Sequence, residues 1–280
     1  MTSPLPHDPP GPDRRPLTVI VPTYNEQEMI GDCLQSVLFA DEILVVDSFS
    51  TDRTLEIARG LGARIIQREF NYPADQKNWA IPQATHEWIL LLDADERATP
   101  ALCEEIRRTL GEEPRVDGYW IRRVNYFLGR PIRHCGWGTD KVIRLFRRDV
   151  SRYKDRLVHE EIDLPEPLPI LEHRLEHLTF RSFGQYFNKL DLYSEWGAGQ
   201  MYRKGRRANA IEVLLRPIGR FIRMYILRLG FLEGGRGLVL SMLGAFSVYL
   251  KYARLWEHGI LRGMSRSEHP GAGNATSRSH

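Results

Sequence analysis

Residues 88–96 read Trp-Ile-Leu-Leu-Leu-Asp-Ala-Asp-Glu, so an apolar run ends abruptly in three carboxylates. A short apolar run of this kind is typical of a buried strand, and open α/β sheets bind their ligands at the carboxyl ends of their strands. Alternation at the strand end can turn Asp93 and Asp95 toward one ligand, and carboxylate oxygens suit Mg²⁺ or Mn²⁺ shared with a diphosphate. The pattern predicts a metal–nucleotide site, with a solvated acidic turn as the alternative.

Apolar runs and helical patterns alternate through the first 111 residues. Strands are expected at 17–22, 43–46, 64–67 and 88–92. Helices are expected at about 26–39, from 52 to Gly60 or Gly62, at 74–84 and from Pro100 to Gly111. This alternation predicts an α/β fold with a mostly parallel, Rossmann-like sheet and helices on both faces. Two β segments follow at 118–124 and 141–146, and beyond about Phe183 the pattern is helical.

The composition is that of a globular protein, and 280 residues can bury one substantial core plus an appendage. Residues 1–15 are rich in proline and lack a continuous apolar segment, so we expect a disordered N-terminus and not a secretory signal. A Gly/Ser/His-rich tail at 263–280 is also expected to be disordered. The protein is expected in the cytosol. Its three cysteines lack metal-ligand spacing, which favours reduced, mostly buried thiols.

Positive charge is concentrated between residues 201 and 236, which hold nine basic and two acidic side chains in a chain of formal net charge +3. A basic segment beside a neutral or acidic body indicates an anionic partner, either a membrane or nucleic acid. Nucleic acid is disfavoured because no recognised binding motif accompanies the charge.

A helix beginning at Pro217 would place one apolar stripe opposite a set of arginines, a pattern typical of helices at a membrane interface. The segment 238–250 is apolar but too short to span a bilayer alone. Together they predict peripheral attachment at the inner face of the cytoplasmic membrane. The alternative is a helical subdomain that packs on the catalytic domain or on another subunit of a homo-oligomer. The stripe comprises Ile218, Phe221, Ile222, Tyr225 and Leu229, and the arginines are Arg216, Arg220 and Arg223.

Four ordered motifs occur, namely Val-Pro-Thr-Tyr-Asn-Glu at 21–26, Val-Asp-Ser-Phe-Ser-Thr-Asp at 46–52, Gln-Lys-Asn at 76–78 and Leu-Asp-Ala-Asp-Glu at 92–96. In this order and spacing they resemble the family 2 glycosyltransferases, which have the GT-A fold. The Arg-Leu-Phe-Arg-Arg that begins at Arg144 and the Val-His-Glu that ends at Glu160 resemble the bacterial lipopolysaccharide-core β-1,4-glucosyltransferase group. The resemblance implies a GT-A catalytic domain at 16–180, followed by a helical, basic, membrane-associating region at 181–262.

For the donor, the resemblance implies that Asp47 bonds the uracil or ribose, although Asp47 as a mere helix-approach residue is the alternative. Lys77 is implied to reach the pyrophosphate or the base-side pocket. The resemblance also implies that Asp93 contacts the ribose or the metal and that Asp95 binds the metal directly. Ser50, Thr51 and Asp52 are interpreted as helix-capping groups. The implied nucleotide-sugar site comprises Pro22, Thr23, Glu26, Asp47, Lys77, Asp93 and Ala94.

An inverting sugar transfer needs a carboxylate to deprotonate the acceptor hydroxyl. Glu160 is the preferred candidate for this base and Asp140 the alternative. His159 would either orient Glu160 or be a packed or surface histidine. Trp137 stands between two glycines and would form either a sugar-stacking wall or part of the core.

The sequence therefore predicts a metal-dependent inverting glycosyltransferase that uses Mg²⁺ or Mn²⁺. It would move glucose or a close relative from a UDP-sugar to a membrane-associated glycolipid or lipopolysaccharide-core acceptor. A sugar-phosphate nucleotidyltransferase is disfavoured because the loop at 22–26 is not rich in glycine, arginine and lysine. A nucleotide-sugar-binding or membrane-scaffolding protein without turnover is the alternative from another class.

Overall fold

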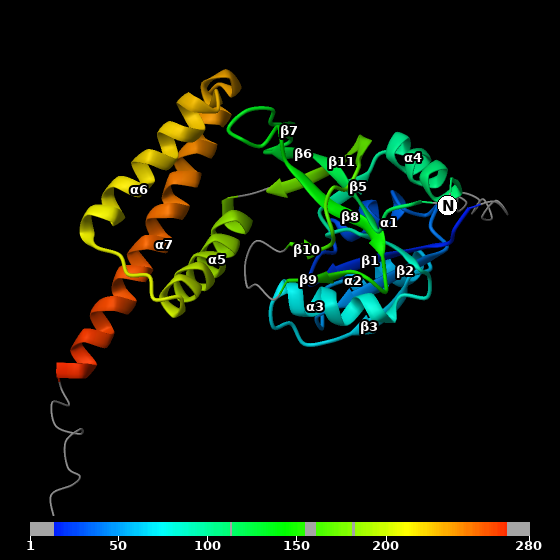
Figure 1. The fold of residues 1–280 in the computed structure, drawn as a ribbon, viewed down its shortest axis with the longest axis horizontal. Coiled ribbons are helices and arrows are strands. Elements are labelled where there is room, and N and C mark those ends of the chain that lie inside the picture. Colours follow the sequence, from blue (N-terminus) through cyan, green and yellow to red (C-terminus); the bar gives the residue numbers. More distant parts are fainter. Residues whose placement is uncertain (1–13, 113, 155–160, 181–182, 268–280) are drawn as a thin grey trace, which may run out of the picture. The chain divides into compact units, whose positions relative to one another are not determined.

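A computed structural model describes residues 14–112, 114–154, 161–180 and 183–267 of the chain. The chain forms two compact units that divide between Phe183 and Gly184 (Figure 1). Most of the expected disordered ends lies outside the described residues. Arg14, at the edge of that region, is anchored by an ion pair to Asp41 with an N–O distance of 2.8 Å.

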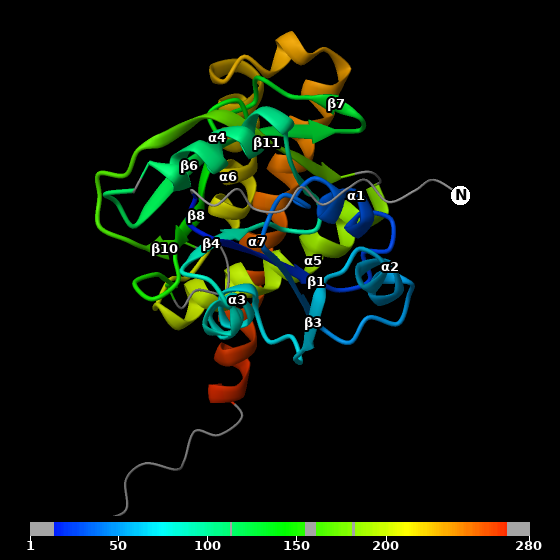
Figure 2. The same ribbon diagram turned by 90° about the vertical axis from the view of Figure 1, so that its right-hand side faces the viewer.

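The first unit is built on one large sheet with the strand order β3-β2-β1-β4-β8-β6-β11-β5. Its first four strands are parallel, as the alternating pattern predicts, and helices flank both faces (Figures 1 and 2). These strands are β1 (Leu17–Thr23), β2 (Glu42–Asp47), β3 (Arg64–Gln67) and β4 (Trp88–Leu91). The expected α/β fold with a mostly parallel, Rossmann-like sheet is confirmed.

Antiparallel pairing begins where β8 joins β4. Strands β6 and β11 then pair in parallel, and β5 closes the sheet antiparallel to β11. The bounds are β5 (Glu96–Ala98), β6 (Gly118–Phe127), β7 (Arg130–Pro131), β8 (Lys141–Arg147) and β11 (Ile170–Phe180). A separate small ladder pairs β9 (Arg152–Tyr153) with β10 (Ile162–Asp163).

Alternate residues of the buried strands pack against different helices. Val19 and Val21 of β1 belong to a cluster with apolar residues of α1, α2 and α4, whereas Ile20 packs in a cluster with Ala74 and Ala80 of α3. Because successive side chains of a strand point to opposite faces, a strand covered on both sides reads as a continuous apolar run. The helices are α1 (Ile30–Gln35), α2 (Thr54–Gly60), α3 (Pro73–Ala80), the 3₁₀ turn η1 (Ile81–Gln83) and α4 (Pro100–Gly111).

The second unit is helical. It comprises α5 (Phe183–Arg203), α6 (Ala210–Ile222), the π-helical segment η2 (Arg223–Leu227), the 3₁₀ segment η3 (Gly230–Glu233) and α7 (Gly235–Ser267). The expectation that Pro217 begins a helix is wrong, because Pro217 lies inside α6. The helix begins instead at Asn209, whose side chain accepts a hydrogen bond from the Glu212 backbone N–H at 2.9 Å, a standard N-cap.

Helix α7 is longer than the apolar segment at 238–250 suggested, with 33 residues. Its portion Gly235–Leu261 is long and apolar enough to cross a membrane by length and composition, and 17% of its 18-residue apolar window is buried. The helix thus extends the apolar segment at 238–250, which alone was expected to be too short to span a bilayer, at both ends. The helix extends past the expected boundary at residue 262.

Candidate functional site

The carboxyl ends of three neighbouring parallel strands bring the candidate residues to one edge of the sheet. Thr23 at the end of β1 is the register partner of Asp47 at the end of β2. Asp93 follows β4, which pairs with the other side of β1. The edge on which open α/β sheets place their ligands therefore carries Thr23, Asp47 and Asp93 together.

Asp47 is fully buried and accepts hydrogen bonds from the turn that follows it. The backbone N–H of Ser50 donates to Asp47 Oδ2 at 3.0 Å and its hydroxyl to Oδ1 at 2.5 Å. Gln67 at the end of β3 donates to Oδ2 at 2.9 Å. An ionised carboxylate accepts about four hydrogen bonds, so one acceptor position is left for a ligand. Asp47 thus already has a structural task in holding the turn that follows it.

Asp93 lies between two buried cations. Lys77 Nζ of α3 is 3.1 Å from Asp93 Oδ1, and Arg144 of β8 hydrogen-bonds to Asp93 Oδ2. Burial alone would raise the pKa of Asp93, but Arg144 and Lys77 hold it well below its usual range. Burial likewise acts to lower the pKa of Arg144, and Asp93 and Glu96 raise it well above its usual range. Asp93 is therefore ionised and fixed in orientation.

The ion pairs continue from Arg144 as a chain of alternating charges. Arg144 donates to the fully buried Glu96 Oε1 at 2.9 Å, and Arg123 of β6 donates to the same oxygen at 3.0 Å. The other Glu96 oxygen accepts from the Asp93 backbone N–H at 3.0 Å. Arg123 also pairs with Asp140, with an N–O distance of 2.8 Å. These ion pairs connect the end of β4 with β6 and β8. The network comprises the cations Lys77, Arg144 and Arg123 and the carboxylates Asp93, Glu96 and Asp140.

Asp95 faces a different set of partners. Its Oδ1 is 3.7 Å from His177 Nε2 of β11, and the other ring nitrogen of His177 is 2.6 Å from Asn125 Oδ1. Asn125 in turn donates to Asp140 Oδ2 at 2.9 Å. His177 and Asn125 therefore link the predicted metal ligand Asp95 to Asp140, one of the two candidate bases.

A buried arginine fixes the turn that carries both aspartates. Arg97 donates to the carbonyl oxygens of Ala94 at 2.8 Å and Glu96 at 2.9 Å, and to that of Met29, just before α1, at 2.7 Å. The turn is thereby tied to the first helix. Ala94 is buried beneath it, so its contribution is its backbone carbonyl rather than an exposed side chain.

The first turn holds a polar group without a hydrogen bond and two exposed aromatic rings. Thr23 is 5% exposed, and its hydroxyl has no hydrogen-bond partner within the described ranges. Tyr24 and Phe49 follow the ends of β1 and β2 and are 58% and 52% exposed. Phe49 has a φ of 62°, in the left-handed region that bulky residues avoid. Such strain in a loop at a ligand-binding edge is a feature of functional sites.

The second and third motifs also build the loops of this edge. Asn25 Oδ1 accepts from the Thr51 backbone N–H at 2.8 Å, and Asp52 Oδ1 accepts from the Thr54 backbone N–H at 2.9 Å. The N-cap residue of α2 is Arg53, which makes no side-chain cap, so the capping interpretation is wrong for Ser50 and Thr51. Asn78 exchanges two hydrogen bonds with the backbone of Tyr153, at 2.9 and 2.8 Å. Pro22 lies in β1, and Glu26 lies in the turn that follows it, where the Glu26 backbone N–H donates to the Thr54 hydroxyl at 2.8 Å.

Both His159 and Glu160 lie outside the described residues, so their predicted roles stay predictions. Trp137 is half-buried and packs edge-on against the buried Phe127, with ring centroids 6.4 Å apart. The three cysteines are free and buried, as expected. In the part of the chain that the structure describes, no three His, Cys, Asp or Glu side chains gather as a metal cluster.

Arg144 was not singled out from the sequence as a site residue, although a signal was present. It stands inside the apolar strand β8 between Ile143 and Leu145, and it is 4% exposed. A charged residue within a buried strand requires a charged partner, because an isolated buried charge is strongly unfavourable. Arg123, Asn125 and His177 gave no comparable local signal, since their partners are far away in the sequence.

Comparisons with known proteins agree with the resemblance in the motifs. The model of the family described as "Glycosyl transferase family 2" matches residues 18–162. A lipopolysaccharide core biosynthesis glycosyltransferase, LpsC of Rhizobium meliloti, is 28% identical over 255 residues, which are 88% of this chain and 94% of that protein. An uncharacterized glycosyltransferase of Rickettsia typhi is 26% identical over 253 residues, 86% of this chain and 87% of that protein. Among solved structures, S. aureus TarS residues 1–349 in complex with UDP-GlcNAc has a TM-score of 0.47 at 15% identity, covering 89% and 92% of the two chains.

Proposed function

The chain belongs to glycosyl transferase family 2 and is a glycosyltransferase, and from this premise we propose that it moves glucose or a close relative from a UDP-sugar to a membrane-associated glycolipid. The acceptor would be a lipopolysaccharide-core or related intermediate. A relative named for lipopolysaccharide core biosynthesis aligns over 88% of this chain, which supports this acceptor class. The proposed place of action is the inner face of the cytoplasmic membrane.

The observation that carries the proposal is the placement of Asp93 and Asp95 beyond β4, beside the ends of β1 and β2. A nucleotide diphosphate bound at this edge would bring its phosphates to the acidic turn, while its base would lie over the turns that follow β1 and β2. The exposed ring of Phe49 is suited to stack on the base there.

The two aspartates suit different tasks toward a divalent metal. Asp93 already balances two cations, so its carboxylate is better suited to fix the site than to give up both partners. Asp95 lies on the same turn, and its Oδ1 is 3.7 Å from His177 Nε2. Mg²⁺ and Mn²⁺ are commonly held by one or two carboxylates together with substrate phosphates and water, which fits Asp95 as the protein ligand. When bound, the metal would neutralise charge on the departing diphosphate.

The chain's residues would then carry out an inverting displacement. The acceptor oxygen forms a bond to the sugar's anomeric carbon as the bond from that carbon to the diphosphate oxygen breaks, and UDP leaves. The acceptor's proton passes to a carboxylate, Glu160 as the preferred candidate and Asp140 as the alternative. Asp140 is held by Arg123 and Asn125 in this structure, which favours a positioning task for it.

A donor screen with the full chain would test the proposal. Purified protein is supplied with one nucleotide sugar at a time, with Mg²⁺, Mn²⁺ or EDTA, and with a membrane extract as the source of acceptor. We expect UDP release to be fastest with UDP-glucose or a close relative, to require metal, and to accompany transfer of label into the lipid fraction. Binding without UDP release for every donor would instead identify a nucleotide-sugar-binding protein.

A further inference from the structure

Helix α6 exposes its apolar side. None of its residues is buried, and Ile211 and Leu214 are 66% and 65% exposed. These residues recur every three or four positions and therefore form one face of the helix. A helix of a water-soluble protein normally turns such a face toward the core. The exposed face comprises Ile211, Leu214, Leu215, Ile218 and Ile222.

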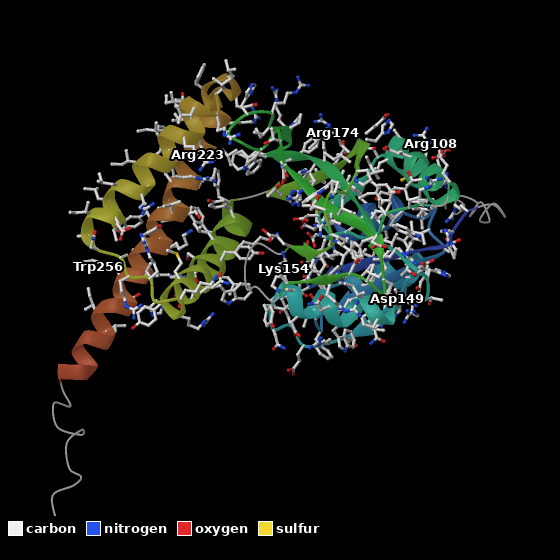
Figure 3. All side chains as sticks on the ribbon, in the orientation of Figure 1. Arg108, Asp149, Lys154, Arg174, Arg223 and Trp256 are labelled. Carbon is white, nitrogen blue, oxygen red and sulfur yellow. The ribbon has the colours of Figure 1, made fainter. Side chains whose placement is uncertain are left out.

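The charged side of α6 faces α7 instead. Arg216 lies over the ring of Tyr252 of α7, 5.5 Å from its centroid. Arg220 lies so close to the α7 backbone that a side chain on Gly244 would come within 3.7 Å of its Nε. Side chains made of carbon project from α6 on the side away from α7 (Figure 3). The amphipathic helix is thus inverted relative to the packing expected in water.

The apolar surface continues beyond α6. Leu227 in η2 is 71% exposed and Leu232 in η3 is 57% exposed. Along α7, Met242, Tyr249 and Trp256 are spaced by seven residues, so they share one side of the helix, and all three are exposed. A surface of this extent on a soluble protein marks a contact with another molecule or with a membrane.

Three basic residues lie near one another in the second unit, namely Arg220 of α6, Arg223 of η2 and Lys251 of α7, whose side chain also runs beside Gly197 of α5. Within the described part of this unit, none of the three forms an ion pair with a carboxylate. Partial burial and the neighbouring Arg223 lower the pKa of Arg220, and partial burial and Arg220 lower the pKa of Lys251. Like charges crowded into a partly desolvated seam destabilise one another, and a bound anion would reverse the effect. Arg220 and Arg223 remain accessible to such an anion.

We propose that the exposed face of α6, η2 and η3 lies in the interface of an anionic phospholipid bilayer, with Arg220, Arg223 and Lys251 binding lipid phosphates. An interfacial helix sinks its apolar face roughly 5–10 Å into the boundary of headgroups and acyl chains. Because a helix with its side chains is about 10 Å across, its opposite side then lies at the level of the phosphates. This surface deepens the proposed function, since it would place the enzyme at its lipid acceptor.

Charge favours a bilayer over a second copy of the chain. In a symmetric dimer the same patch meets itself, so the basic segment of one subunit would face that of its partner. Nine basic residues against two acidic ones between 201 and 236 would make this pairing repulsive. An anionic leaflet supplies both the apolar phase and the missing negative charge.

Vesicle sedimentation of the full chain tests this surface. Parent protein should partition onto phosphatidylcholine vesicles that contain phosphatidylglycerol far better than onto phosphatidylcholine alone. The variant R220Q/K251Q should partition about thirtyfold more weakly onto the anionic vesicles, because each basic residue near an anionic leaflet contributes a factor of about five. The variant L214N/I218N should lose binding to both kinds of vesicle.

A matched control removes the same charge from the catalytic unit. Arg59 and Arg108 are exposed there, and R59Q/R108Q should partition like the parent. Thermal unfolding of R220Q/K251Q without lipid should occur at or above the parental temperature, because no ion pair is broken. Parental partitioning of R220Q/K251Q, or an equal loss in R59Q/R108Q, would overturn the proposal. So would a parent that ignores vesicles and self-associates through a face that L214N/I218N disrupts.

UDP release from the nucleotide sugar in the absence of lipid separates this inference from the proposed function. We expect R220Q/K251Q to retain the parental rate of donor hydrolysis while its lipid binding falls. If neither the parent nor R220Q/K251Q releases UDP but the vesicle results are as expected, the proposed reaction is wrong and the proposed membrane surface stands.

Discussion

Lys77 and Asp93 form an ion pair in which Nζ lies 3.1 Å from Oδ1, with the lysine side chain 6% exposed and the aspartate 35% exposed. The buried ammonium also lies 5.5 Å from the centroid of the Tyr153 ring. Since a buried cation requires a partner, Lys77 fixes Asp93 at the surface of the sheet edge. Asp93, one of the two carboxylates predicted at the metal–nucleotide site, is therefore also part of the site's charge network.

Replacing Arg144 by glutamine should destabilise the protein by roughly 3 kcal/mol at neutral pH, because the fully buried Glu96 and the adjacent Asp93 lose a shared partner. Urea unfolding measures this change. The control is Arg147→Gln on the same strand, where the arginine is 42% exposed, and its cost should stay below about 1 kcal/mol. Equal costs for the two variants would contradict the charge network.

Lowering the pH should reduce the free energy of unfolding of the parent through the same charge network. The folded-state pKa of Asp93 lies well below the ordinary aspartate pKa of 3.8, so the stabilisation that Asp93 provides is fully present above pH 3.8 and is lost as the pH falls below it. We expect the difference in free energy of unfolding between the parent and Arg144→Gln to shrink when urea unfolding is repeated near the lower end of this window. A difference that is constant with pH would show that Asp93 does not depend on Arg144.

Changing Asp95 to asparagine should reduce metal-dependent UDP release by about 10²–10³-fold, because it removes the anionic ligand at the diphosphate. Thermal unfolding should match the parent, since the side chain lies at a strand end outside the core. Mn²⁺ titrations of both activity and direct binding provide the measurement. Asp149→Asn, which alters a 69% exposed aspartate after β8, should keep the parental metal response. Unchanged metal affinity in Asp95→Asn would remove Asp95 from the site.

The edge of the parallel sheet could be predicted because each of its strands can be recognised from its own residues. A strand covered on both faces must be apolar at every position, so 88–92 and 43–46 are recognisable without any partner. The capped helix α4 is equally local, since Thr99 accepts from the Leu102 backbone N–H at 3.2 Å within one turn. These elements place Asp47, Asp93 and Asp95 without knowledge of the remaining fold.

Strand β11 could not be recognised in the same way. Its sequence, Ile-Leu-Glu-His-Arg-Leu-Glu-His-Leu-Thr-Phe, mixes charged and apolar residues without a strict alternation. Its polar side chains meet partners that are distant in the sequence: His173 Nδ1 lies 3.0 Å from Glu105 Oε2, and Glu176 Oε1 accepts from the Tyr126 hydroxyl at 2.9 Å. His177 reaches the site only through this strand. In the second unit, α6 begins after its N-cap residue Asn209 and not at Pro217, which lies inside the helix.

Glu160→Gln should lower kcat by about 10²–10⁴-fold with little change in the dissociation constant of the donor, because a general base acts on the acceptor proton and not on donor binding. The adjacent Glu161→Gln is the control, and its 57% exposed side chain predicts parental kinetics. Asp140→Asn should mainly weaken the links to Arg123 and Asn125, and hence lower the unfolding temperature more than kcat. If Glu160→Gln remains active while Asp140→Asn loses the chemical step, Asp140 is the base.

Phe49 offers a test of nucleotide binding that separates the ring from the backbone. Its ring is 52% exposed beside the buried Asp47, and its φ of 62° is unfavourable for any residue with a Cβ. If the ring stacks on the donor's base, Phe49→Ala and Phe49→Gly should each weaken UDP binding by about 10–100-fold, the loss typical of one base–aromatic stack. Calorimetric titration with UDP measures this loss.

The two variants should differ in stability although they lose the same ring. Glycine adopts a positive φ without the steric cost that alanine retains, so Phe49→Gly should be more stable than Phe49→Ala by about 1 kcal/mol in urea unfolding. Phe49→Trp keeps an aromatic face and should retain UDP binding close to the parent. Parental affinity in both the alanine and glycine variants would show that the exposed ring does not touch the base, and that the strain in this turn serves only to hold Ser50 against Asp47.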